Sequence, residues 1–128
     1  PILPEGLRVL IAEDNEINGD ILADMLAKAG VRSIRVVNGI EAVAAAKKYH
    51  FDAILMDCQM PEMDGFEATR QIRDLPDESK NVPIIAATAN AFVEDKERCL
   101  QVGMNDYITK PITRAALLQA LARNLKLI

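Results

Sequence analysis

Short apolar runs alternate along the chain with longer segments in which apolar residues recur every three or four positions. The short runs have the length of β-strands and cover Leu7–Ala12, Ser33–Val37, Ala53–Met56, Ile84–Ala87 and Asp106–Thr109. The segments between them have a helical period, as in the stripe formed by Ile17, Ile21, Leu22, Met25, Leu26 and Ala29. Strict alternation of strands and helices implies right-handed crossovers, and so predicts a parallel sheet with helices on both faces.

Local signals support the predicted helices. Asn38 with Glu41, and Asp64 with Glu67, have the spacing of a capping box, in which a short polar side chain caps the helix and an acid follows three residues later. Gly30 stands where the first helix should end, and glycine readily takes the positive φ of such an end. The helices therefore have start and stop signals of their own.

The composition of the strands predicts their order. Three runs are apolar throughout, as strands covered on both faces must be, namely Val9–Ile11, Ile54–Met56 and Ile84–Ala86. The second and fifth runs contain polar residues, which suits the edges of a sheet. The resulting order, 2-1-3-4-5, defines a doubly wound, flavodoxin-like α/β fold of five parallel strands. Such folds bind ligands at the crevice where the strand order reverses, here between strands one and three.

Length and charge restrict the class of protein. The chain has 128 residues, 50% of them hydrophobic, which is enough for one domain with its own core. Its 15 basic and 19 acidic residues give a net charge of −4, which argues against nucleic acid, because phosphate backbones are bound by clustered Lys and Arg. No apolar run approaches the roughly 20 residues that span a bilayer. Two cysteines make no disulfide framework, which favours a cytoplasmic setting.

Chemically active side chains follow four of the predicted strands. Glu13 and Asp14 follow the first strand, Asp57 the third, Thr88 the fourth and Lys110 the fifth. The carboxyl ends of parallel strands share one edge, so these side chains should lie together. Three carboxylates and one ammonium leave two negative charges, which one divalent cation would cancel. Mg²⁺ suits this site, since it takes one or two carboxylates and completes its shell with waters and phosphate oxygens.

A carboxylate beside Mg²⁺ and a lysine, with a hydroxyl nearby, is an acceptor for a phosphoryl group, because the cations absorb the charge of the transferring group. Taken singly, each residue has a simpler explanation. Asp14 or Asn15 could cap the next helix, Thr88 could bond the backbone, and Lys110 could be a surface charge. Their combination on one edge favours the functional interpretation.

Five segments also carry a family resemblance. They are IAEDNEIN (11–18), NGIEAV (38–43), DAILMDCQMPEMDGFEATRQIR (52–73), PIIAATANAF (83–92) and GMNDYITKPI (103–112). In their order and spacing the chain resembles the receiver domain of two-component response regulators. The EDN start, the QMPEMDG run and the TANAF segment resemble receivers attached to hybrid sensor histidine kinases.

The resemblance implies that Asp57 takes a phosphoryl group from a phosphohistidine of a histidine kinase or histidine phosphotransfer domain. By position, Asp14, Asp57 and the backbone carbonyl of Gln59 would bind Mg²⁺ directly. Glu13, which stands where the family more usually has Asp, would act largely through a bound water. Helix one and the neighbouring loop would form the docking face.

The resemblance also implies a switch. Thr88 and Lys110 would contact the phosphoryl oxygens, and the rotamer of Tyr107 would report the phosphorylation state. The bond between Lys110 and Pro111 would be cis. Residues 1–6 would be the end of an upstream linker and residues 7–128 the receiver, in a cytoplasmic domain whose parent kinase could be anchored in the inner membrane.

Several alternatives remain open from the sequence. One is a stand-alone response regulator, and another is a degenerate receiver that only docks. A Mg²⁺-dependent phosphatase that forms an aspartyl-phosphate would want a second acid close to its nucleophile, but Asp57 is followed by Cys58 and Gln59. A flavin-binding module would want phosphate-binding groups in its first loop, where Glu13 and Asp14 repel phosphate.

Overall fold

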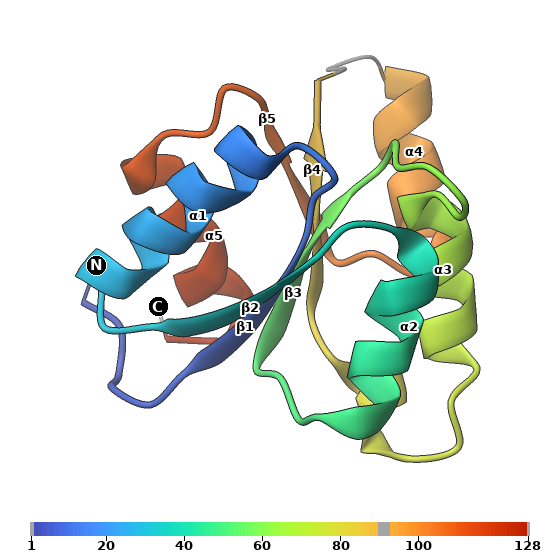
Figure 1. The fold of residues 1–128 in the computed structure, drawn as a ribbon, viewed down its shortest axis with the longest axis horizontal. Coiled ribbons are helices and arrows are strands. Elements are labelled where there is room, and N and C mark those ends of the chain that lie inside the picture. The colour runs from blue at the N-terminus through green and yellow to red at the C-terminus, as the bar shows by residue number, and fades with distance from the viewer. Residues whose placement is uncertain (1, 90–92, 128) are drawn as a thin grey trace.

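Strands and helices alternate strictly in the computed structural model, which describes residues 2–89 and 93–127 (Figure 1). In chain order the elements are β1 (Arg8–Ala12), α1 (Glu16–Lys28), β2 (Arg32–Val36), α2 (Gly39–Lys48), β3 (Ala53–Asp57), α3 (Gly65–Arg73), the 3₁₀ helix η1 (Glu78–Asn81), β4 (Ile84–Thr88), α4 (Val93–Val102), β5 (Asp106–Thr109) and α5 (Arg114–Asn124). The last three residues of the segment 83–92 lie outside the described residues. In the described part of the chain, no helix is both long and apolar enough to cross a membrane.

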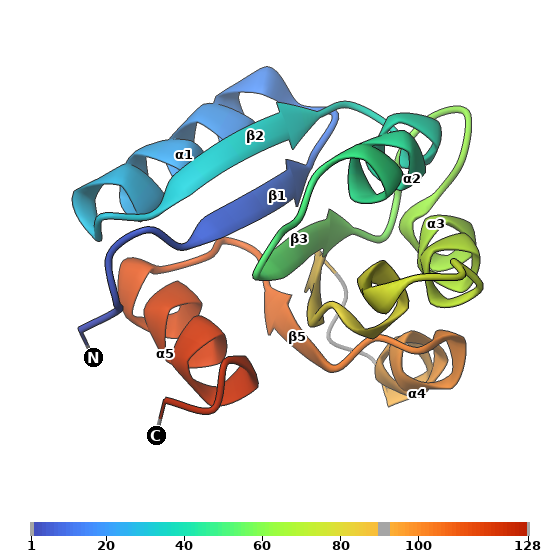
Figure 2. The same cartoon turned by 90° about the horizontal axis from the view of Figure 1, so that it is seen from below.

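The five strands are parallel and stand in the order β2-β1-β3-β4-β5, which confirms the predicted topology. Figure 2 shows α1 and α5 on one face of the sheet and α2, α3 and α4 on the other. Every residue of β3 and β4 is buried, whereas β2 and β5 are only partly buried. The polar content of the second and fifth runs was therefore a correct sign of edge strands.

Alternation along the central strands divides the core into two apolar layers. Leu10 and Ala12 of β1 belong to the layer beneath α2, α3 and α4, whereas Val9 and Ile11 belong to the layer beneath α1 and α5. Successive side chains of a strand point to opposite faces, so a strand covered on both faces needs apolar residues at every position. This explains why the central runs are apolar throughout, and it gives the sheet a firm frame for its loops.

The predicted strand bounds were wrong by one residue at several ends. β1 begins at Arg8, and β2 begins and ends one residue earlier than predicted. β3 and β4 extend one residue further, because Asp57 is paired with Ala87 and Thr88 with Thr109. The two candidate side chains Asp57 and Thr88 thus stand on hydrogen-bonded strands and not on the loops beyond them.

The predicted helix forms as α1, but only part of its apolar stripe is buried. Ile17 is 70% exposed and Ile21 is 48% exposed, whereas Leu22 and Leu26 are buried. Successive residues of a helix differ by about 100° in direction. The row of Ile17 and Ile21 is therefore turned away from the row that packs on the sheet. The helix ends as predicted, with Gly30 at a φ of 79°.

Both predicted caps form. The side chain of Asn38 accepts the N–H of Glu41 at 2.8 Å, and that of Asp64 accepts the N–H of Glu67 at 2.9 Å. The return bonds differ from the standard capping box. Glu41 accepts the N–H of Val37, one residue before the cap, at 3.1 Å. The carboxylate of Glu67 instead bonds side chains further along α3.

Candidate functional site

The sheet brings the predicted side chains together at its carboxyl edge, which is the end of the sheet where all five strands finish. Glu13 and Asp14 follow the last residue of β1, Asp57 ends β3, Thr88 ends β4 and Lys110 follows β5. Because β1 pairs with β3 and β3 with β4, the carboxylates and the hydroxyl come from adjacent strands. The edge lies where the strand order reverses between β1 and β3, which is where a doubly wound sheet binds its ligands.

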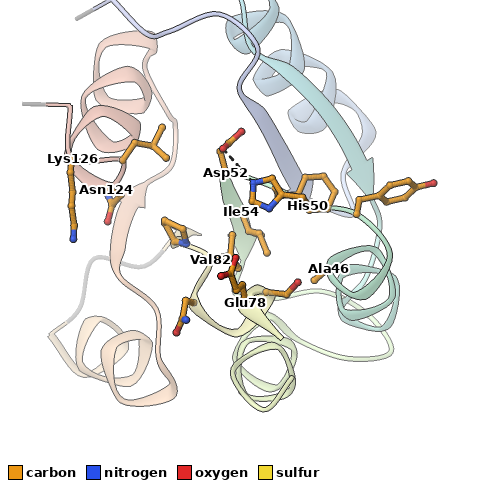
Figure 3. Close-up of a pocket in the computed structure, with 14 residues that line it drawn as sticks. Ala46, His50, Asp52, Ile54, Glu78, Val82, Asn124 and Lys126 are labelled. Carbon is orange, nitrogen blue, oxygen red and sulfur yellow. Dashed lines mark ion pairs between the residues drawn. The ribbon is translucent and has the colours of Figure 1, made fainter. Parts of the chain in front are cut away.

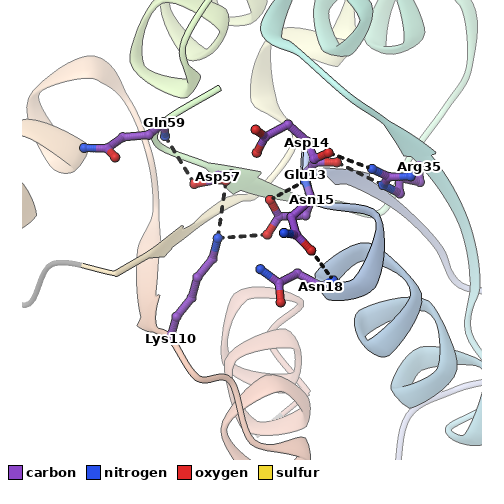
Figure 4. A network of polar contacts seen from close by, with 8 residues as sticks. All are labelled: Glu13, Asp14, Asn15, Asn18, Arg35, Asp57, Gln59 and Lys110. Carbon is purple, nitrogen blue, oxygen red and sulfur yellow. Dashed lines mark hydrogen bonds and ion pairs between the residues drawn. The ribbon is translucent and has the colours of Figure 1, made fainter. Parts of the chain in front are cut away.

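Lys110 bridges two of the three acids. Its Nζ lies 2.8 Å from Oε1 of Glu13 and 3.3 Å from Oδ2 of Asp57 (Figure 4). The side chains of Glu13 and Asp57 are only 2% and 10% exposed. Buried carboxylates are costly unless they are paired, so Lys110 is the residue that makes this crowding tolerable.

Burial and crowding separate the pKa values of the two buried acids. Burial, followed by the hydrogen bond with Glu13 and its negative charge, raises the pKa of Asp57 to about 6. Burial tends to raise the pKa of Glu13 as well, but the hydrogen bonds of Glu13 with Lys110 and Asp57 leave this pKa below its ordinary value. Burial tends to lower the pKa of Lys110, yet the bonds of Lys110 with the two acids raise this pKa overall. Asp57 is therefore the acid that takes up a proton first.

The three acids fit a hard divalent cation. One carboxylate oxygen each from Glu13, Asp14 and Asp57 can be chosen so that all lie within 4.8 Å of one another. Asp14 is exposed, which leaves one side of the cluster open to waters. Oxygen ligands with room for several waters match the preference of Mg²⁺. The backbone carbonyl of Gln59 stays a predicted ligand, while its N–H donates to Oδ1 of Asp57 at 3.2 Å.

A small cavity joins the acid to the predicted phosphoryl contacts. It has a volume of about 150 Å³, and Asp57, Gln59, Thr88 and Lys110 are among its lining residues. Thr88 is buried, with 7% of its surface exposed. Asp57, Thr88 and Lys110 thus line one space, at the strand ends where the sequence predicts them to meet.

Two further predictions concern β5 and the loop that follows it. The bond between Lys110 and Pro111 is cis, as the resemblance implied. Tyr107 is half-buried on β5, and Nζ of Lys96 lies 4.6 Å from the centroid of its ring. An ammonium over a ring face is attractive, so this contact favours the present position of the ring.

The loop after β1 has one partner that sequence reasoning missed. Arg35 of β2 donates from Nε to the carbonyl of Glu13 at 2.9 Å and from Nη2 to the carbonyl of Asp14 at 3.1 Å. The only sequence signal was a long basic side chain in an edge strand. The capping role in this loop falls to Asn15, which accepts the N–H of Asn18 at 2.9 Å, and not to Asp14.

A second cavity, of about 390 Å³, lies at the opposite end of the sheet, where the strands begin (Figure 3). His50 stands at its rim with an 85% exposed side chain, and its Nε2 lies 3.7 Å from Oδ1 of Asp52. Among the described residues, the only group of three acids, cysteines or histidines placed to hold a metal is the one at the carboxyl edge. The carboxyl ends of the strands are therefore the candidate functional site.

A parallel five-stranded sheet with acids, a hydroxyl and a lysine at its carboxyl edge defines a class of signalling domain. The chain belongs to the response regulator receiver domain family, whose sequence model matches residues 9–122. It is thus a receiver domain of two-component signalling.

Curated relatives include both much longer proteins and proteins of similar length. The chain is 46% identical over 129 residues to hybrid signal transduction histidine kinase B of Dictyostelium discoideum, in an alignment that covers 92% of this chain and 7% of that protein. It is 44% identical over 105 residues to the polar-differentiation response regulator DivK of Brucella anthropi, which covers 82% of this chain and 85% of DivK. The chain therefore spans only a small part of its hybrid-kinase relatives.

Solved structures agree with this assignment. The receiver domain of sensor histidine kinase PA1611 from Pseudomonas aeruginosa, which has a magnesium ion in its active site cleft, matches with a TM-score of 0.88 and 47% identity, over 94% of this chain and 98% of that one. The receiver domain of Saccharomyces cerevisiae Ssk1, solved with the histidine phosphotransfer protein Ypd1, matches with a TM-score of 0.87 and 38% identity, over 95% of this chain and 90% of that one.

The raised pKa of Asp57 predicts a gain in stability when its charge is removed. In the folded protein this pKa is about 6, whereas in the unfolded chain it is roughly 4. The ionised carboxylate therefore costs folding free energy above pH 6, and this cost fades as the pH falls towards 4. Without metal at pH 8, Asp57→Asn should raise the free energy of unfolding by about 1–2 kcal/mol in urea titrations.

The control for this prediction is Asp52→Asn, at the opposite end of β3. Oδ2 of Asp52 accepts the N–H of Arg8 at 2.8 Å, and Asn keeps that acceptor. This variant should show no gain that disappears on acidification. A gain for Asp57→Asn of equal size at pH 5 and pH 8, or no gain at all, would contradict the raised pKa.

Proposed function

We propose that the domain is the Mg²⁺-dependent phosphoacceptor of a two-component phosphorelay, with Asp57 as the acceptor. The observation that carries this proposal is the position of Asp57. Its carboxylate belongs to the acid cluster, lies 3.3 Å from Nζ of Lys110, and lines one cavity with Lys110 and the buried Thr88. Negative charge would hold a cation on one side, and positive charge would meet a phosphoryl group on the other.

Asp14, Asp57 and the carbonyl of Gln59 would hold Mg²⁺, with Glu13 acting through a water. When bound, the cation would neutralise charge on the transferring group. A carboxylate oxygen of Asp57 attacks the phosphorus, the bond from phosphorus to the donor histidine nitrogen breaks, and that nitrogen keeps the electron pair. Lys110, already paired with two acids, is placed to turn towards a phosphoryl oxygen.

Thr88 and Tyr107 would form the switch. Thr88 lines the cavity that a phosphoryl group on Asp57 would occupy, and its hydroxyl would turn to donate to one of the new oxygens. Movement of Thr88 would open space into which the ring of Tyr107 can turn. That turn would take the ring from beneath Lys96, which couples α4 to the state of the site.

The phosphodonor would dock on α1 and the loop after β5. Ile17 and Ile21 expose apolar surface there, and Ile21, Pro111 and Ile112 line a hollow of about 400 Å³ that also reaches Glu13. A donor histidine has to approach Asp57 beside this surface. Contiguous exposed apolar residues next to a reactive site mark a protein partner. The complex of the Ssk1 receiver with Ypd1 supports a histidine phosphotransfer domain or histidine kinase as that partner.

The parent protein would be a hybrid histidine kinase, which carries residues 7–128 as its receiver after a linker that ends at residue 6. The similarity to hybrid signal transduction histidine kinase B supports this origin. The domain would work in the cytoplasm, without direct contact with nucleic acid. A second candidate is a stand-alone response regulator, which the match across most of DivK favours.

The direct test is incubation with a phosphorylated histidine phosphotransfer domain and Mg²⁺. We expect stoichiometric transfer of one phosphoryl group to Asp57, and loss of transfer when a chelator removes the metal. Asp57→Asn should accept none, because the amide lacks a nucleophilic oxygen, whereas Asp52→Asn should be labelled like the wild type. Labelling is measured by intact-mass spectrometry and by phosphorylation-dependent gel mobility.

Two outcomes would contradict the assignment. One is wild-type labelling of Asp57→Asn. The other is rapid multiple turnover of p-nitrophenyl phosphate, which would favour a phosphatase that uses an aspartyl-phosphate.

The docking face is tested by separating partner recognition from chemistry. Ile21→Glu should slow transfer from the phosphotransfer domain at least about tenfold, because a buried contact of this size contributes 1.4 kcal/mol or more. Labelling by the small donor acetyl phosphate should be unchanged. Ile40→Glu is the matched control, since Ile40 is 52% exposed on α2. Equal transfer rates for the two variants would place the docking face elsewhere.

A further inference from the structure

Arg35 reaches from the edge strand β2 to the loop that carries two of the acids. Its two bonds, 2.9 Å to the carbonyl of Glu13 and 3.1 Å to the carbonyl of Asp14, hold two successive peptide groups (Figure 4). A guanidinium presents its donors in a fixed plane, so this pair of bonds sets the orientation of the loop as well as its distance from the sheet.

Gly19 provides the space for this side chain. It is buried in α1, and a Cβ at this position would overlap Cδ and Nε of Arg35. Glycine inside a helix costs roughly 1 kcal/mol relative to alanine. The helix thus carries its least favourable non-proline residue at the point where the stem of Arg35 passes.

We propose that Arg35, accommodated by Gly19, is a positioning residue for the cation site. Both of its bonds go to backbone oxygens, so it fixes where the carboxylates of Glu13 and Asp14 stand and leaves their charge available to the cation. The inference rests on the proposed function, because it assumes that these acids bind Mg²⁺. Residues that hold metal ligands in place commonly change metal affinity by about 10- to 100-fold when they are removed.

The sign of the effect separates positioning from simple charge. A positive charge close to a cation site opposes cation binding. If Arg35 acted only through its charge, its removal would tighten Mg²⁺ binding. If it positions the loop, its removal weakens binding although a repulsive charge has gone.

Isothermal titration with Mg²⁺ measures this sign. Arg35→Ala should weaken Mg²⁺ binding about tenfold. Arg35→Lys keeps the charge but lacks the planar pair of donors, so it should not restore the affinity. Arg32→Ala is the control, because Arg32 is exposed at the other end of β2. Affinity for Arg35→Ala that equals or exceeds that of the wild type would overturn the inference.

A second readout uses the metal-free protein. Amide hydrogen exchange at residues 13–15 should become faster in Arg35→Ala and stay unchanged in Arg32→Ala, while urea titration reports any global loss of stability. Slower or unchanged exchange at residues 13–15 would contradict a positioning role.

Gly19→Ala completes the design. Its methyl group should displace Arg35 and weaken Mg²⁺ binding in the wild-type background. In the Arg35→Ala background it should cause no further loss, since no guanidinium stem remains to be displaced. Equal losses in both backgrounds would show that Gly19 acts through the helix and not through Arg35.

Failure of this inference is distinct from failure of the proposed function. Wild-type protein that binds no Mg²⁺ overturns both. Wild-type protein that binds Mg²⁺, together with an Arg35→Ala variant of equal affinity, overturns only the role of Arg35.

Discussion

Repulsion among three carboxylates at one edge of a parallel sheet is the constraint on which the site depends. The register of β1 and β3 brings Glu13, which follows β1, next to Asp57, which ends β3, and both residues are buried. Lys110 offsets part of their charge through direct bonds, and Arg35 holds the backbone of the loop from behind. The remaining negative charge would attract a cation, and burial together with the neighbouring Glu13 raises the pKa of Asp57.

The two apolar layers explain how such a strained cluster persists. Each face of the sheet has its own helices and its own core, so β3 and β4 are buried along their whole length and cannot shift to relieve the repulsion. Asp57 and Thr88 are the last paired residues of those strands, so the packing of the strands also fixes their backbone positions. The neighbouring surface of α1, where Ile17 and Ile21 are exposed, does not pack on the sheet and would be available to a partner.

Most of the fold could be predicted because its signals are local. Runs of apolar residues identified the central strands, and caps such as Asn38 and Asp64 marked the helix starts. The meeting of the candidate site residues could also be predicted, because the carboxyl ends of parallel strands lie at the same end of the sheet. The partners of Arg35 could not be predicted, since they depend on the register between β1 and β2. Periodicity also marked Ile17 as apolar without showing which part of the helix surface the sheet covers.

The central claim is that Glu13, Asp14 and Asp57 together bind one divalent cation. Calorimetric titration with Mg²⁺ at pH 8 and pH 5 tests it most directly, with Asp24→Asn on the exposed side of α1 as the control for Asp14→Asn. The account predicts one site per chain that is weakened by Asp14→Asn and at pH 5, where Asp57 is protonated, and unchanged by Asp24→Asn. Binding that neither Asp14→Asn nor acid weakens would contradict it.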